Sequence, residues 1–112
     1  MTTAQKLGYI KVILGISSSD TTQDDMLTSF LTIAGEAILE WMYVNYSGVP
    51  TTVTDVPDKY AMAQVNAVVA GYNLRGGENQ WKHSENGIVR EWHYTDMMQY
   101  IRAHVNQIPK VG

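Results

Sequence analysis

The chain has 112 residues, 45% of them hydrophobic, and a formal net charge of −3 at pH 7. This length is enough for one domain with a sizeable core, and the mixing of acidic and basic residues argues against a protein that binds nucleic acid by neutralising phosphates. The absence of cysteine excludes disulfides, zinc–thiolate sites and cysteine nucleophiles.

A first helix is predicted over roughly residues 3–14, because apolar residues recur there at helical spacing. Its expected inward-facing residues are Leu7, Ile10, Ile13 and Leu14. Gly15 stands where a helix C-cap favours glycine. The polar residues 17–22 after it are typical of a loop that supplies N-cap side chains.

The longest predicted helix runs from about Gln23 to Tyr43, with Asp24 and Asp25 in the first turn, where carboxylates favour the positive end of the helix dipole. Its apolar stripe comprises Leu27, Phe30, Leu31, Ala34, Ala37, Ile38, Trp41 and Met42. We expect this helix to be the spine of the core.

Two further helices are predicted downstream. The third starts at Pro57, since proline suits a first helical turn, and stops at Gly76-Gly77. Its apolar stripe is Ala61, Val65, Val68, Val69 and Tyr72. The fourth begins near Thr95-Asp96 and ends before Pro109. Its expected inward-facing residues are Met97 or Met98, Ile101 and Val105.

Between these helices, Asn86-Gly87 stands between two β-prone runs and predicts a two-residue type I′ hairpin turn. Counting outward from the turn places Trp81 opposite Trp92, and one face of the hairpin then carries Trp81, His83, Glu85, Ile88, Arg90 and Trp92. A lone hairpin is marginal in water, so this one packs either on its own helices or, through its distal half, on another subunit. The predicted fold is mainly α: a small four-helix bundle in a single domain (residues 1–112), with one β-hairpin (about residues 80–93) between helices 3 and 4.

No catalytic, metal or cofactor site is predicted. In the predicted register His83 and His93 lie on opposite faces of the hairpin, and no histidine spacing typical of a zinc site occurs. Asp24 and Asp25 point about 100° apart on a helix and do not converge on a substrate. No apolar run approaches the roughly 18 residues of a membrane span, and the N-terminal stretch lacks the cleavage pattern of a signal peptide.

Three stretches resemble the small head–tail connector (adaptor) proteins of long-tailed bacteriophages and prophages, a family also described as gp6-like or DNA-packaging connectors. The first is residues 9–16 with Asp24-Asp25-Met26-Leu27 after a Ser/Asp loop, and the second is Val56-Pro57-Asp58-Lys59. The third and most distinctive is Gly76-Gly77-Glu78-Asn79-Gln80 together with His83-Ser84-Glu85-Asn86-Gly87-Ile88. The resemblance covers nearly the whole chain.

The resemblance implies a non-enzymatic structural protein of the virion neck, made in the bacterial host cytoplasm. Such proteins form a homo-oligomeric ring, here expected to be a dodecamer, below the portal protein. The ring joins the DNA-filled head to the next head-completion or tail protein and lets double-stranded DNA pass without sequence-specific binding. The expected subunit interface is the hairpin, through Trp81, His83, Glu85, Asn86, Gly87, Ile88, Arg90 and Trp92. The alternatives are a small helical DNA-binding or regulatory adaptor protein and an unrecognised enzyme.

Overall fold

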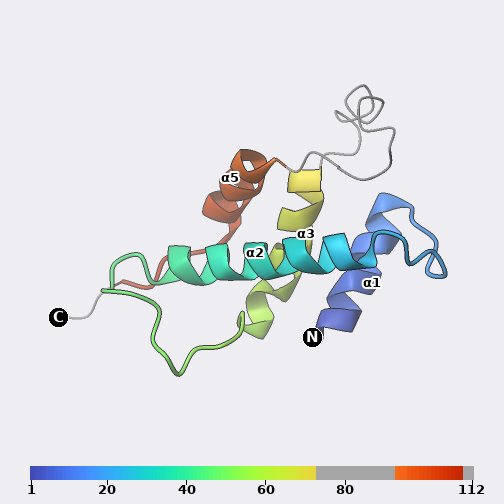
Figure 1. The fold of residues 1–112 in the computed structure, drawn as a ribbon. Helices are drawn as coiled ribbons and strands as arrows, with labels where there is room; N and C mark the ends of the chain where they lie inside the picture. Colours follow the sequence, from blue (N-terminus) through green and yellow to red (C-terminus); the bar gives the residue numbers. More distant parts are fainter. Residues whose placement is uncertain (73–92, 110–112) are drawn as a thin grey trace.

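The computed structural model describes residues 1–72 and 93–109, in which four α-helices pack around one hydrophobic core (Figure 1). The elements are α1 (Thr3–Leu14), α2 (Asp24–Met42), the 3-10 helix η1 (Asp58–Tyr60), α3 (Ala61–Tyr72) and α5 (Tyr94–His104). α3 packs against each of the other three α-helices, so it is the centre of the bundle. α1 lies at the N-terminal end of the long helix α2.

Helix α1 begins and ends with sequence signals that satisfy its free backbone groups. Thr2 and Gln5 form a capping box, in which the Gln5 backbone N–H donates to Thr2 Oγ1 at 3.1 Å and the Thr2 N–H donates to Gln5 Oε1 at 2.8 Å. The C-cap is Gly15, as predicted, in the left-handed conformation with φ 76°. Both ends of this helix therefore follow from local sequence.

The inner face of α1 differs from the prediction. Ile10 is fully buried, but Ile13, expected to face inward, is 47% exposed. The other buried residues of α1 are two lysines, Lys6 and Lys11. Both ammonium groups have partners inside the protein, Gln64 for Lys6 and Asp24 for Lys11. The spacing of apolar residues alone does not reveal such partners.

Helix α2 matches its predicted range to within a residue at each end, and its apolar stripe is the largest contribution to the core. Its buried residues are Leu27, Leu31, Ala34, Gly35, Ala37, Ile38 and Met42. The predicted capping by residues 17–22 is wrong: the N-cap is Gln23, which makes no side-chain cap hydrogen bond. Asp24 and Asp25 in the first turn provide the favourable charge instead.

The third and fourth helices also begin close to their predicted starts. Pro57 is the N-cap of η1, which continues directly into α3, and His93 is the N-cap of α5. Met97, Ile101 and Val105 are buried, as expected. The predicted end of the third helix at residues 76–77 lies outside the described residues.

The prediction of a β-hairpin in the fold is wrong. The structure is helical, with no strand in residues 1–72 and 93–109. His93, assigned to the end of the second strand, instead caps α5, and its backbone N–H donates to the carbonyl of Gly71 at 2.7 Å. That bond ties the start of α5 to the end of α3. Residues 80–92 of the predicted hairpin lie outside the described residues.

After α5 the chain returns along the C-terminal end of α2. The Trp41 indole Nε1–H donates to the Val105 carbonyl at 2.9 Å, and the Ile108 N–H donates to the Met42 carbonyl at 2.8 Å. The Asn106 N–H donates to the Tyr60 hydroxyl at 3.1 Å. Residues 105–109 thus join α2 to the segment that leads into α3.

Candidate functional site

The interface residues predicted from sequence, Trp81, His83, Glu85, Asn86, Gly87, Ile88, Arg90 and Trp92, all lie outside the described residues. In the described parts of the chain, no three His, Asp or Glu side chains are placed together so that they would hold a metal ion. The candidate sites in the described residues are instead a polar cleft and an apolar face, neither of which was predicted.

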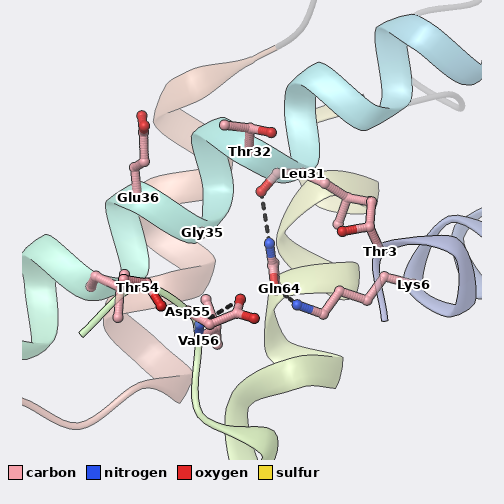
Figure 2. Close-up of a pocket in the computed structure, with 11 residues that line it drawn as sticks. Thr3, Lys6, Leu31, Thr32, Gly35, Glu36, Thr54, Asp55, Val56 and Gln64 are labelled. Carbon is pink, nitrogen blue, oxygen red and sulfur yellow. Dashed lines mark hydrogen bonds between the residues drawn. The ribbon is translucent and has the colours of Figure 1, made fainter. Parts of the chain in front are cut away.

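A cleft of about 230 Å³ opens between α1, α2, α3 and the segment that precedes η1 (Figure 2). Lys6 enters it from α1 and Gln64 from α3, while Thr32, Gly35 and Glu36 line it from α2. Thr54, Asp55 and Val56 complete the wall. The cleft combines a buried cation with carboxylates, since Glu36 and Asp55 are exposed and lie at its rim.

The polar centre of this cleft is a short hydrogen-bonded chain that joins three helices. Lys6 Nζ donates to Gln64 Oε1 at 2.6 Å, and Gln64 Nε2 donates to the carbonyl of Leu31 at 2.7 Å. Both side chains are buried, Lys6 to 5% exposure. The Gln64 amide is therefore held at both its oxygen and its nitrogen, which fixes its orientation.

Gly35 makes room for that amide. A Cβ atom at Gly35 would lie 2.9 Å from Gln64 Nε2 and 3.6 Å from Gln64 Cδ. The first distance is shorter than a van der Waals contact, so a side chain at position 35 would push the amide away from Leu31. The close approach of α2 and α3 at this level depends on glycine.

A second buried lysine, Lys11, joins α1 to the start of α2. Its Nζ lies 2.9 Å from Asp24 Oδ1 in an ion pair and donates to the Ser18 carbonyl at 3.3 Å. In the connecting loop, the hydroxyl and N–H of Thr22 both donate to Asp20 Oδ1, and these bonds lower the pKa of that carboxyl below its usual value.

The outer face of α1 is apolar and exposed. Val12 is 77% exposed, and Tyr9 and Ile13 flank it. Beside Val12 runs a shallow groove lined mainly by apolar and small residues, including Leu7, Gly8 and Ile16. Large contiguous apolar patches often mark surfaces that bind other proteins, so this face is a candidate for such a surface.

Sequence reasoning missed Lys6, Lys11 and Gln64. A signal for the lysines was present: Lys6 is four residues before Ile10 and Lys11 four residues after Leu7, so both share the helix face of the apolar residues. Gln64 likewise precedes Val65 and Val68 within the third apolar stripe. A polar residue on an inward face indicates an internal partner.

The chain is similar to one family of known proteins. None of the helices in residues 1–72 and 93–109 combines the length and apolar character that crossing a membrane requires. No curated protein and no solved structure was found to match. Residues 4–108 match the model of one family, described as phage gp6-like head-tail connector protein. Because that match covers nearly the whole chain, the protein belongs to the gp6-like head–tail connector family of phages.

Proposed function

We propose that this connector acts as a ring of identical subunits below the portal protein, where it closes the filled head and receives the next head-completion or tail protein. The observation that carries the proposal is the family match over residues 4–108. Membership gives the protein a structural role in the virion neck, in association with other head and tail proteins. The ring, the portal contact and a dodecameric subunit number are the proposed parts.

A closed ring of one chain needs a head-to-tail interface, so each subunit must present two different patches. The outer face of α1 supplies one candidate, centred on Val12. The second is the surface around Val44, which is 51% exposed and lies just beyond the C-terminal end of α2. α2 has 19 residues and is about 28 Å long, and α1 lies at its opposite end (Figure 1). This separation supports a head-to-tail arrangement.

The eight residues predicted from sequence, from Trp81 to Trp92, remain part of the proposed interface. Their composition supports this, since tryptophan and arginine are enriched where proteins bind one another. The passage of double-stranded DNA through the ring is also proposed. A net charge of −3 is compatible with it, because a mildly acidic wall does not trap phosphates.

The ring is tested by placing a charge on the outer face of α1. Val12→Glu adds a carboxylate that must be desolvated if this face is covered by a neighbour, and the side chain is exposed in the subunit, so folding should be preserved. We expect complemented phage lysates to contain separate heads and tails. A buried, unpaired charge costs about 3 kcal/mol at each subunit contact, which weakens the contact about 100-fold, and infectious particles should fall by about 100-fold or more.

The matched control is Gln99→Glu, which adds the same charge to an exposed position of α5. It should leave particle yield unchanged. Normal yield with a well-folded Val12→Glu protein would remove the α1 face from the interface. Electron microscopy of particle necks that shows no ring of this protein would refute the proposal itself. The same yield assay applied to Trp92→Ala tests the interface predicted from sequence.

A further inference from the structure

The cleft of Figure 2 contains a buried lysine that forms no ion pair with any of the described residues. Lys6 is 5% exposed, and its ammonium group has one hydrogen bond, to the neutral amide of Gln64. An ammonium carries more N–H donors than that bond uses. A buried charge without a counter-charge is unfavourable, and it is normally paired or bound to a ligand.

Lys11 shows how the same helix neutralises a buried lysine. Its Nζ has both a carboxylate, Asp24, and the Ser18 carbonyl as partners. Lys6 forms no such ion pair within residues 1–72 and 93–109, although Glu36 and Asp55 line the same cleft. One Asp55 oxygen is already used, since it accepts from the Val56 N–H at 3.0 Å. The two buried lysines of α1 therefore differ in that Lys11 has a carboxylate partner and Lys6 has none among the described residues.

We infer that this cleft binds a carboxylate side chain, aspartate or glutamate, presented by a protein partner, with Lys6 Nζ as its counter-ion. A volume of about 230 Å³ accommodates a side chain of that size. Thr3 and Thr54 also line the cleft, and their hydroxyls are neutral hydrogen-bonding groups. The bond formed is a charge-assisted N–H···O hydrogen bond, which is strongest where water is excluded.

The rim of the cleft favours a peptide over the DNA backbone. Glu36 and Asp55 are hydrogen-bond acceptors, and the chain that carries an acidic side chain has backbone N–H groups to donate to them. Glu36 and Asp55 repel a phosphate and a carboxylate alike, but only a polypeptide brings N–H donors that offset this repulsion, and a DNA backbone has none. The Lys6 ammonium thus matches the carboxylate of an acidic residue, and Glu36 and Asp55 match the N–H groups of the backbone that carries it.

The inference goes beyond the proposed ring and does not depend on it, because Lys6 lies on the buried side of α1 and Val12 on the exposed side. It is tested with the whole chain in solution, labelled at lysine side chains for NMR. The probes are N-acetyl-glutamate N-methylamide, the matching glutamine compound and a short duplex DNA, all at equal ionic strength. The Lys6 signal is assigned with Lys6→Met, and the Lys11 signal is the internal control.

We expect a saturable shift of the Lys6 side-chain signal with the glutamate compound, no shift of Lys11, and binding of the glutamine compound about tenfold weaker or less. Both lysines are read in the unmodified protein, so the result does not depend on how well a variant folds. Three outcomes overturn the inference: no saturable shift of Lys6, equal shifts with glutamate and glutamine, or a Lys6 shift produced by DNA and not by glutamate.

Discussion

At the scale of single residues, the buried contact between α2 and α3 depends on three groups that fit closely. Gln64 is held by Lys6 at its oxygen and by the Leu31 carbonyl at its nitrogen, and Gly35 leaves the space that the amide occupies. Each member fixes the position of the next. Side-chain flexibility usually absorbs a small clash, but here any movement of the Gln64 amide breaks or lengthens one of its two hydrogen bonds.

Gly35→Ala therefore reverses the usual effect of this substitution. Alanine in place of glycine inside a helix normally stabilises by about 1 kcal/mol. Here the new Cβ would lie 2.9 Å from Gln64 Nε2 and displace it from the Leu31 carbonyl, and a broken buried hydrogen bond costs about 1–3 kcal/mol. We expect no gain and a net loss of up to about 2 kcal/mol in the free energy of unfolding, measured by urea titration.

Gly8→Ala is the matched control. Gly8 also lies within a helix, but its Cβ position has no heavy atom within 4 Å. The same substitution there should raise the free energy of unfolding by about 0.5–1 kcal/mol. A Gly35→Ala protein that gains as much as Gly8→Ala would show that the Gln64 amide is free to move.

The sequence predicts individual residues unevenly. Most apolar positions of α2, α3 and α5 are buried as predicted, because each has many apolar neighbours at regular spacing, whereas Phe30, Trp41 and Val69 are only partly buried. Lys6, Lys11 and Gln64 are missed because their burial depends on specific acceptors contributed by distant parts of the chain. Spacing places these residues on inward faces but does not identify the groups that pair with them.

At the scale of elements, Trp41 of α2 contacts both α5 and the segment after it. Its indole Nε1–H donates to the Val105 carbonyl at 2.9 Å, and the Arg102 guanidinium lies 5.5 Å from the centre of its ring. The first contact joins side chain to backbone, and the second is a cation–π contact. Both lie at the C-terminal end of α5.

Trp41→Phe tests this attachment. Phenylalanine keeps an aromatic ring but removes the N–H donor, leaves the Val105 carbonyl without that partner and weakens the contact with Arg102. A net hydrogen bond contributes about 1 kcal/mol and an exposed cation–π contact about 0.5–1 kcal/mol. We expect the free energy of unfolding to fall by about 1–2 kcal/mol, measured by chemical denaturation.

Tyr46→Phe provides the comparison, because it also removes a single side-chain donor to residues 105–109. The donor is a hydroxyl in Tyr46 and an N–H in Trp41. The Tyr46 hydroxyl donates to the Pro109 carbonyl at 3.3 Å in an exposed position. Its loss should change stability by no more than about 0.5 kcal/mol. Equal effects of the two substitutions would contradict the role given to Trp41.

The positions of the helices are easier to predict than the conformation between them. Helix positions follow from periodicity over many residues, so α1 and α2 begin and end within a residue of expectation. The β-hairpin was predicted from the two residues Asn86-Gly87 and pairings that contribute only about 0.2–1 kcal/mol each. At its one described position, His93, a helix cap and a bond to the Gly71 carbonyl replace the strand. The preference of a two-residue turn is too weak to determine the conformation of a neighbouring residue that has tertiary contacts of this kind.

At the scale of the whole molecule, the returning segment of residues 105–109 connects parts of the chain that are far apart in sequence. Val105 is buried in the core, Asn106 bonds to Tyr60 beside α3, and Ile108 bonds to the end of α2. Periodicity predicts the last helix, but no sequence signal assigns a role to the residues after it. Pro109 marks a stop for a helix and carries no information about the direction of the chain.

A chain that ends at His104 should be much less stable than one that ends at Pro109, which keeps every contact described for this segment. Its loss exposes the core position of Val105, worth about 1.5–3 kcal/mol, and removes hydrogen bonds worth about 1 kcal/mol each. The bonds lost include those from Trp41, Asn106 and Ile108. Together they predict a fall of about 4.5–6 kcal/mol in the free energy of unfolding, which a urea titration of both proteins would measure. Equal unfolding midpoints and slopes would show that the helices hold together without the returning segment, and that its contacts with α2 and Tyr60 contribute nothing to the stability of the subunit.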